Sequence, residues 1–199
     1  MRKVIKCLVS SATIMAIMAT STIESFAYNY DGSATAYAYT YAENYNKKYT
    51  YFDKGDCTNF VSQAVNAGGI SIADSKPGGV AENNLNAWYI KYVDGTWRYS
   101  RSWTVVEDFK EYMKKRKCAT VKTFSQKNWA CIYEIVENGD VLQVDGEHSV
   151  MITEIGERTG NTIKYCGHTN DVQNGKINII KNQAKENWAS KDIVIIHFK

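Results

Sequence analysis

The chain has 199 residues, of which 44% are hydrophobic and 23% charged, and its formal net charge at pH 7 is +3. This length suffices for one domain with a well-buried core. The small net charge argues against a nucleic-acid partner. Its longest basic run, Lys114-Lys115-Arg116-Lys117, lies at the end of a predicted helix, where cations stabilise the helix dipole. We therefore predict no nucleic-acid function.

The first 27 residues have the pattern of a secretory signal peptide. Basic residues at positions 2, 3 and 6 precede an apolar stretch over residues 7–19, and Ser25-Phe26-Ala27 supplies small residues for cleavage before Tyr28. The apolar stretch is too short to span a bilayer, so we expect no stable membrane anchor. We predict a secreted, extracellular protein with one domain over residues 28–199. Removal of three basic residues and Glu24 would lower its net charge from +3 to +1.

Two helices are predicted in the first third of that domain. Residues 31–33 can cap a helix over residues 34–48, with alanines and tyrosines along one stripe. Cys57 opens a second helix, because apolar residues at 60, 61, 64 and 65 share one face and Gly68-Gly69 can end it. A thiol in the first turn faces unpaired backbone N–H groups and the positive helix end, which stabilise a thiolate. Cys57 is therefore a candidate nucleophile, although a lone cysteine is also often a small core residue.

The middle of the chain is harder to assign. Residues 71–103 include the one proline, Pro77, and most of the tryptophans, without clear periodicity. Such a stretch can be a lid or binding loop, so its aromatic rings would either contact a substrate or fasten the loop to the core. Thr104-Val105-Val106-Glu107 has the pattern of a capping box, which predicts a helix to about residue 116.

The C-terminal half is predicted to form strands. Residues 141–144 and 148–155 are rich in β-branched residues, and residues 156–161 read as a turn before a strand over 162–167. Folding this pair about a turn centred near residues 158–159 brings the start of one strand opposite residues 168–170. A final strand is expected over residues 193–198.

The histidines give this hairpin a chemical interpretation. His148 starts the first strand, and His168 and Asn170 follow the second. We expect a His148 base to meet a polar orienter, His168 or Asn170, across the two strands. With Cys57 they would form the Cys-His-polar arrangement of nucleophilic catalysis. His197, in the final strand, is expected to be structural.

The motifs also carry a family resemblance. The run Gly55-Asp56-Cys57-Thr58-Asn59-Phe60-Val61-Ser62-Gln63 resembles the opening motif of a bacterial putative amidase domain family. Further blocks match in order: Ala67-Gly68-Gly69, Trp88-Tyr89, Ser102-Trp103-Thr104, Gly139-Asp140-Val141-Leu142-Gln143, His148-Ser149-Val150 and His168-Thr169-Asn170-Asp171. That family is similar to the papain-like CHAP and NlpC groups of cell-wall hydrolases.

The resemblance implies an α+β, papain-like cysteine hydrolase fold, with N-terminal helices packed on a small antiparallel sheet. It also implies hydrolysis of amide bonds, with Cys57 as nucleophile, His148 as base and His168 or Asn170 as third residue. We expect a monomeric amidase or peptidase that forms a thioester and needs no cofactor. Its substrate would contain an amide or a peptide, with peptidoglycan as one candidate. Two alternatives stay open: an inert secreted domain that binds peptide or glycan, and a Cys-His acyltransferase.

The remaining cysteines bear on these hypotheses. A free Cys57 leaves Cys118, Cys131 and Cys166, which can form at most one bridge, with 118 and 131 nearest in sequence. A zinc site built from Cys57, His148 and His168 is disfavoured, because catalytic zinc ligands usually have tighter spacing. We therefore expect no metal.

Overall fold

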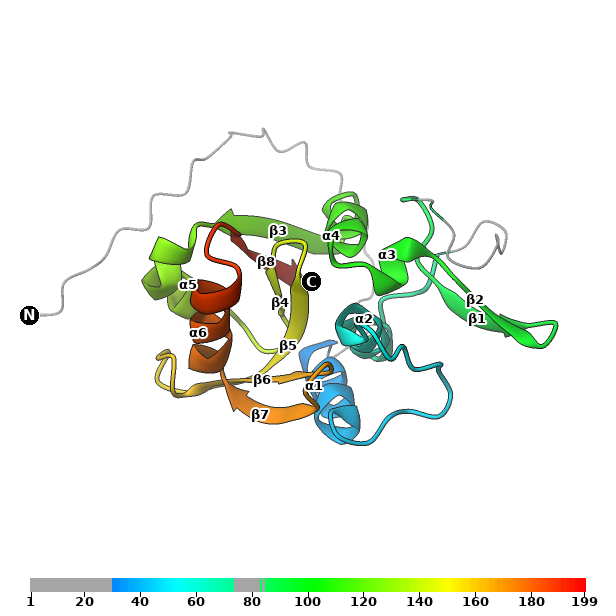
Figure 1. Ribbon diagram of the computed structural model, residues 1–199, viewed down its shortest axis with the longest axis horizontal. Coiled ribbons are helices and arrows are strands. Elements are labelled where there is room, and N and C mark those ends of the chain that lie inside the picture. The colour runs from blue at the N-terminus through cyan, green and yellow to red at the C-terminus, as the bar shows by residue number, and fades with distance from the viewer. Residues whose placement is uncertain (1–29, 74–82, 84) are drawn as a thin grey trace, which may run out of the picture.

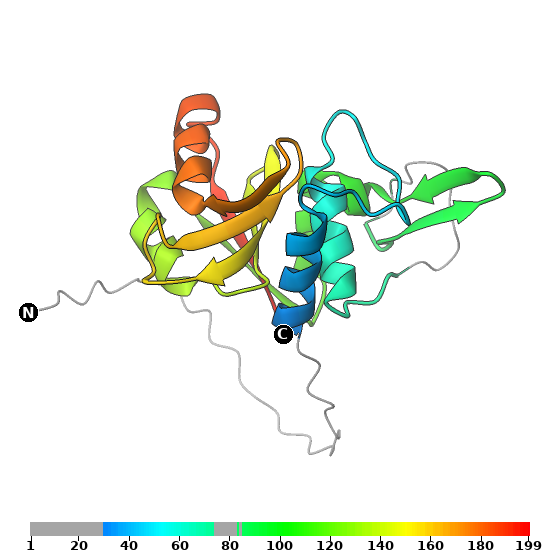
Figure 2. The same ribbon diagram turned by 90° about the horizontal axis from the view of Figure 1, so that it is seen from below.

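The structure is a computed structural model that describes residues 30–73, 83 and 85–199 (Figure 1). The predicted signal peptide, residues 1–27, and Pro77 lie outside the described residues. Within them, helices cover both faces of an antiparallel sheet, so the α+β class predicted from the sequence is confirmed (Figures 1 and 2).

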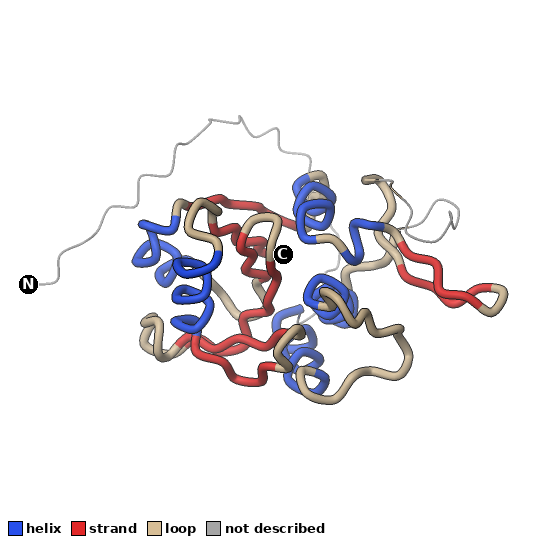
Figure 3. The backbone as a smooth tube through the Cα atoms, in the orientation of Figure 1, coloured by secondary structure: helices blue, strands red, loops and turns tan. Residues whose placement is uncertain are grey.

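The helices are α1 (Tyr30–Tyr41), α2 (Cys57–Ala67), α3 (Arg101–Thr104), α4 (Val106–Lys114), α5 (Trp129–Ile135) and α6 (Ile177–Asn187), with a 3-10 helix η1 at Gln126–Asn128. The strands are β1 (Ile90–Val93), β2 (Thr96–Tyr99), β3 (Ala119–Phe124), β4 (Val141–Val144), β5 (His148–Ile155), β6 (Ile163–Gly167), β7 (Val172–Lys176) and β8 (Ile193–Phe198). Six strands form one sheet in the order β3-β8-β4-β5-β6-β7, with each neighbouring pair antiparallel. The hairpin of β1 and β2 projects from the body of the molecule (Figure 3).

The six-stranded sheet separates two hydrophobic cores. The first core joins α1, α2 and α4 to one face of the sheet, and the second joins α5 and α6 to the other. Both faces of the central strands are covered, so all four residues of β4 are buried. Figure 2 shows α6 and α2 on opposite sides of the sheet. The candidate nucleophile therefore belongs to the α1–α2 side.

Helix α1 packs closely against α2 because its buried stripe is small. Tyr30, Ala34 and Ala38 recur every four residues and are buried, which places them on one face. The helix ends at Tyr41 rather than at the predicted residue 48. The turn that follows has a local cause, because the Asn46 side chain accepts a hydrogen bond from the backbone N–H of Lys48 at 3.0 Å, and asparagine favours such turns over helix. The chain then runs as a loop to Asp56.

The stretch over residues 71–103 is more ordered than predicted where the structure describes it. It contains the β1–β2 hairpin, and Trp88 and Trp103 are fully buried in the first core with ring centroids 4.6 Å apart. For these two rings the packing interpretation is correct. Tyr92, on the projecting hairpin, is 62% exposed. The rings of this region therefore divide between core and surface.

The predicted capping box is wrong in detail. Thr104 is the last residue of α3, and α4 begins at Val106 behind a Val105 cap without a side-chain hydrogen bond. Cys57, Cys118 and Cys166 are free cysteines, so the bridge between residues 118 and 131 that the sequence left open does not form. Several elements were not predicted from the sequence: β1, β2, α3, β3, η1, α5, β7 and α6.

The predicted C-terminal hairpin is confirmed. β5 and β6 are antiparallel partners, with Met151 opposite Cys166. This register centres the hairpin between residues 158 and 159, as predicted. The pairing shifts by one residue between Ile152 and Glu154, further from the candidate site. The strand order thus brings the start of β5 and the end of β6 to the side of the sheet near α2, which contacts both strands.

Candidate active site

Helix α2 is buried from Cys57 through Val65, polar residues included. Burial of a polar side chain is costly unless it is hydrogen-bonded, and the polar residues of this helix have partners. Asn59 donates to the Thr50 carbonyl and accepts from the Trp103 indole, and Ser62 donates to the Trp103 carbonyl. Gln63 accepts from the Tyr37 hydroxyl at 2.7 Å. The polar residues after Cys57 thus fasten neighbouring segments to the helix and fix its position.

The Cys57 thiol lies in the first turn of α2, 5% exposed, between α2 and β5. The backbone N–H groups of Ser149 and Thr58 donate to the sulfur, and the Thr58 hydroxyl lies 3.8 Å from it. Burial raises the pKa of the Cys57 thiol; these hydrogen bonds lower it, and the charge of Asp56 raises it further. The net direction is upward, so the thiol is the resting form. The low-pKa thiolate expected from helix position alone is not the resting state of this structure.

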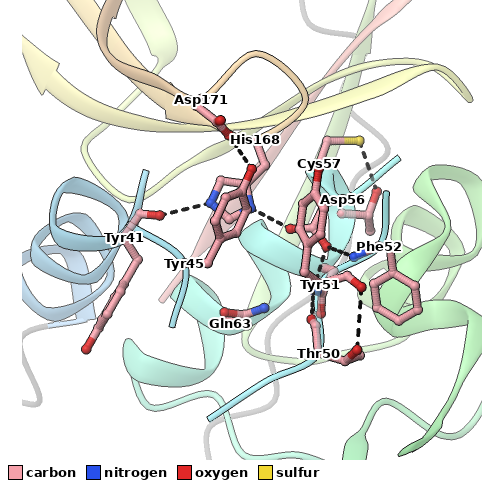
Figure 4. A network of polar contacts seen from close by, with 12 residues as sticks. Tyr41, Tyr45, Thr50, Tyr51, Phe52, Asp56, Cys57, Gln63, His168 and Asp171 are labelled. Atoms are coloured by element: carbon pink, nitrogen blue, oxygen red, sulfur yellow. Dashed lines mark hydrogen bonds and ion pairs between the residues drawn. The ribbon is translucent and has the colours of Figure 1, made fainter. Parts of the chain in front are cut away.

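Asp56, which precedes the thiol, pairs with His168 (Figure 4). The Asp56 Oδ2 to His168 Nδ1 distance is 2.5 Å, and both side chains are 2% exposed. The other carboxylate oxygen accepts from the backbone N–H of Phe52 and from the amide of Asn59. Because every partner of Asp56 is a donor, the carboxylate holds the loop before α2, the start of α2 and the end of β6 together.

Both nitrogens of the His168 ring are occupied. Nε2 lies 2.9 Å from the Tyr41 carbonyl, which can only accept, so Nε2 donates. Nδ1 faces the Asp56 carboxylate, and the ring stacks on Phe60 with centroids 4.1 Å apart. Both nitrogens thus face partners other than Cys57, so neither is placed to accept a proton from the thiol. His168 therefore acts on the thiol through Asp56, which makes it a positioning residue in this structure.

His148 lies elsewhere. Its ring stacks near Trp188, with centroids 6.3 Å apart, on the side of β5 that carries Val150 and the second core. Burial lowers the pKa of the imidazole from 6.5 to about 4, so it is neutral at neutral pH. Among the described residues, no hydrogen bond or ion pair joins His148 to Cys57. The structure thus brings Cys57 and His168 to one network and leaves His148 outside it.

Strand parity explains this arrangement. The register of β5 and β6 continues to His148 opposite residue 169, and residues directly opposite each other share a face. His168 therefore faces the other way and shares the α2 side with Ser149, whose hydroxyl lies 3.2 Å from that of Thr58. The expected meeting of His148 with His168 does not occur. The predicted centre of the hairpin is correct, but it pairs His148 with residue 169 and Ser149 with His168, so the two histidines point to opposite faces of the sheet.

The other candidate residues lie apart from the thiol. Asn170 is exposed in the turn between β6 and β7, and no hydrogen bond of its side chain is found within the described residues. His197 donates to or accepts from buried Asp140 across 2.9 Å, on strand β8. Burial raises the pKa of Asp140 to about 6, against the lowering effect of hydrogen bonds from Glu137 and His197. His197 is part of the sheet's own packing, as the sequence suggested.

The residues that sequence reasoning missed are Asp56 as a partner of His168, and the polar side chains Thr58, Gln143 and Ser149 near the sulfur. Asp56 and Thr58 flank Cys57 in the sequence, but their partners lie about a hundred residues away, so the sequence did not reveal the contacts.

Among the described residues there is no group of three or more His, Cys, Asp and Glu that could hold a metal ion. The same part of the chain contains no helix with the length and apolarity needed to cross a bilayer.

Comparison with known proteins places this geometry in context. A family model described as Putative amidase domain matches residues 28–191. The chain is also similar to a protein of Bacillus subtilis (strain 168) named "Uncharacterized protein YjcM", at 32% identity over 119 residues. The aligned part covers 59% of this chain and 23% of that protein, so the chain spans under a quarter of the relative. No solved structure matches the chain.

Proposed function

The chain belongs to the putative amidase domain family, and from this premise we propose that it hydrolyses amide bonds with Cys57 as nucleophile, through a thioester. The observation that carries the proposal is the donor set at the sulfur: the backbone N–H groups of Ser149 and Thr58, and the Thr58 hydroxyl. Such donors stabilise the negative charge that sulfur must develop during attack. A cysteine that only fills a core has no need of them.

The base in this proposal is His148. A base needs a free lone pair, and the nitrogens of His148 have no hydrogen-bond partner in the described residues. Burial lowers its pKa to about 4, so the imidazole is neutral but gains basic strength only when it leaves this buried position. His168 has neither nitrogen free. The residue after His148 already donates its backbone N–H to the sulfur. Because the ring faces the second core in this structure, the start of β5 must rearrange when substrate binds, so that the imidazole leaves Trp188 and turns to the α2 side.

The proposed steps balance as follows. The Cys57 thiol passes its proton to His148 as the sulfur attacks the amide carbonyl carbon. The oxyanion is stabilised by N–H groups at the start of α2, which lie ahead of the first helical hydrogen bond, from Phe60 to Asp56. Protonated His148 gives its proton to the leaving amine, and a thioester remains. Water, deprotonated by His148, then releases the carboxylic acid and restores the thiol.

We extend the proposal to the fold and the setting. A cysteine at the start of a buried helix packed on an antiparallel sheet is consistent with a papain-like hydrolase. The signal-peptide pattern of residues 1–27 supports secretion. For a secreted amidase, the peptide bridges and stem peptides of a cell wall are the first substrate class to test, with other extracellular peptides as the comparison.

One observation favours a different class. Burial raises the pKa of the Cys57 thiol and no imidazole contacts it in this structure, as would suit an inert domain that binds peptide or glycan. The two functions differ in whether the thiol is consumed. The enzyme forms a covalent thioester with its substrate, and the binding domain does not.

The deciding experiment incubates the purified domain with peptidoglycan fragments and with unrelated peptides, and measures released amines. We expect activity in the wild type, none in Cys57→Ala, and strong loss in His148→Ala, with circular dichroism showing that each variant is folded. Activity retained in Cys57→Ala refutes the proposal. An acyltransferase would instead give more of a new amide when a second amine is added.

A further inference from the structure

A chain of buried polar side chains leads from strand β4 to the Cys57 sulfur. The Gln143 amide nitrogen lies 3.0 Å from the Ser149 hydroxyl, that hydroxyl lies 3.2 Å from the Thr58 hydroxyl, and the latter lies 3.8 Å from the sulfur. Gln143, Ser149 and Thr58 are each fully buried. A polar chain in a core has to be explained by what it does, because each member must be paired.

The direction of the hydrogen bonds in this chain follows from its far end. The Gln143 amide nitrogen also lies 3.2 Å from the Val106 carbonyl, which can only accept. This contact fixes the orientation of the amide, because the flipped group would set two oxygens against each other. The Gln143 amide oxygen has no hydrogen-bond partner, which is consistent with an amide held by its donors. Gln143 therefore donates to Ser149.

The two hydroxyls must then point toward the sulfur. If Thr58 donated to Ser149, the Ser149 hydroxyl would accept twice and its own hydrogen would have no acceptor among the described residues. If Ser149 donates to Thr58, the Thr58 hydrogen is free for the sulfur and every donor is used. Buried donors are rarely left unpaired, so the second arrangement is the stable one.

We infer that Gln143, Ser149 and Thr58 form a one-way chain of hydrogen-bond donors that ends on the Cys57 sulfur and stabilises its anionic form. Gln143 and Ser149 are positioning residues, since they act on the sulfur through Thr58. The chain deepens the proposed function, because it would help the sulfur of Cys57 to develop charge during attack. It opposes burial, which disfavours the anion.

Other titratable groups near the sulfur are accounted for. Asp56 acts against the anion, and it is paired with His168 from the end of β6. His148, the residue before Ser149 on β5, turns its ring toward Trp188. Within the described residues, no hydrogen bond or ion pair joins the side chain of His168 or of His148 to the three members of the chain. A change in the chain can therefore be read at the thiol without removing either imidazole.

The test measures the pH midpoint of Cys57 alkylation by iodoacetamide, read on the Cys57 peptide by mass spectrometry because Cys118 is also a free thiol. Thr58→Val keeps the shape and removes the last donor, and should raise the midpoint by about one pH unit. Thr58→Ser keeps the hydroxyl and should match the wild type. Gln143→Met, three links from the sulfur, should shift the midpoint in the same direction by less. Ser149→Ala provides the same test if Gln143→Met fails to fold.

The outcomes separate this inference from the proposed function. An unchanged midpoint in Thr58→Val overturns the chain. A shift in Thr58→Val without one in Gln143→Met or Ser149→Ala also overturns it, because Thr58 would then act alone. The measurement needs no substrate, so the chain can be upheld even if amidase activity survives in Cys57→Ala. That last result would refute the proposed function and leave the chain standing.

Discussion

Substitution of His148 by glutamine should remove a stability loss that the protein suffers in acid. The imidazole has a pKa of about 4 in the folded protein and 6.5 when exposed in the unfolded chain. Between those values the unfolded chain binds a proton that the folded protein does not, so the free energy of unfolding falls as pH drops from about 6.5 to about 4. A difference of about 2.5 pH units corresponds to about 3 kcal/mol when fully expressed. Glutamine does not titrate and should escape this loss.

The assay is urea unfolding, followed by tryptophan fluorescence, of the wild type and His148→Gln at a series of pH values. Asp140 titrates in the same range with the opposite sign, because its pKa is raised to about 6 and it stabilises the folded protein when protonated. It is present in both proteins, so it cancels in their difference. We expect wild-type stability to fall relative to the variant by up to about 3 kcal/mol on acidification. Parallel curves would refute the buried, neutral His148.

Three further changes test the packing around the site. His168→Ala leaves the Asp56 carboxylate buried without the imidazole and should lower the free energy of unfolding in urea by about 3–5 kcal/mol. Adding Asp56→Asn should restore part of this loss, and a His168→Ala variant as stable as the wild type would contradict the pair. Gly68→Ala would set a Cβ 2.5 Å from the Tyr30 ring, so it should lower the free energy of unfolding by about 1–3 kcal/mol and lower the melting temperature. An unchanged melting temperature would contradict the packing of α1 against Gly68. Arg158→Ala removes hydrogen bonds to three carbonyls at the end of α5 and should lower the free energy of unfolding by about 1–2 kcal/mol. Arg158→Lys should lower it less, and equal melting temperatures of the two variants would contradict a role of the guanidinium in capping α5.

The sequence predicted those features that depend on local pattern. The helix that begins at Cys57, the strand that begins at His148 and the hairpin centred near residues 158–159 all follow from short-range periodicity and turn residues. These elements brought Cys57 and His168 to one side of the sheet. They did so through Asp56, at a contact between residues 112 positions apart, which no local pattern specifies.

The errors also have physical causes. The helix predicted over residues 34–48 ends at Tyr41, and residues 46–48 form a turn instead, in which the Asn46 side chain accepts from the Lys48 N–H that a helix would have used. The face of His148 was misassigned because one residue of register reverses every side chain of a strand. The unpredicted β3 is half-exposed and carries lysine among its β-branched residues, so it lacks a clean alternation. Its place in the sheet comes from pairing with β8.

The position of β8 has a consequence for the order of events during synthesis. Residues 193–198 form an inner strand, between β3 and β4, so a chain in which they have not yet been synthesised cannot join β3 to the four strands β4, β5, β6 and β7. Both cores draw on this strand, since Val194 and Ile196 lie in the first and Ile193 and Ile195 in the second. The emerging polypeptide therefore stays unable to close its sheet until these residues are available.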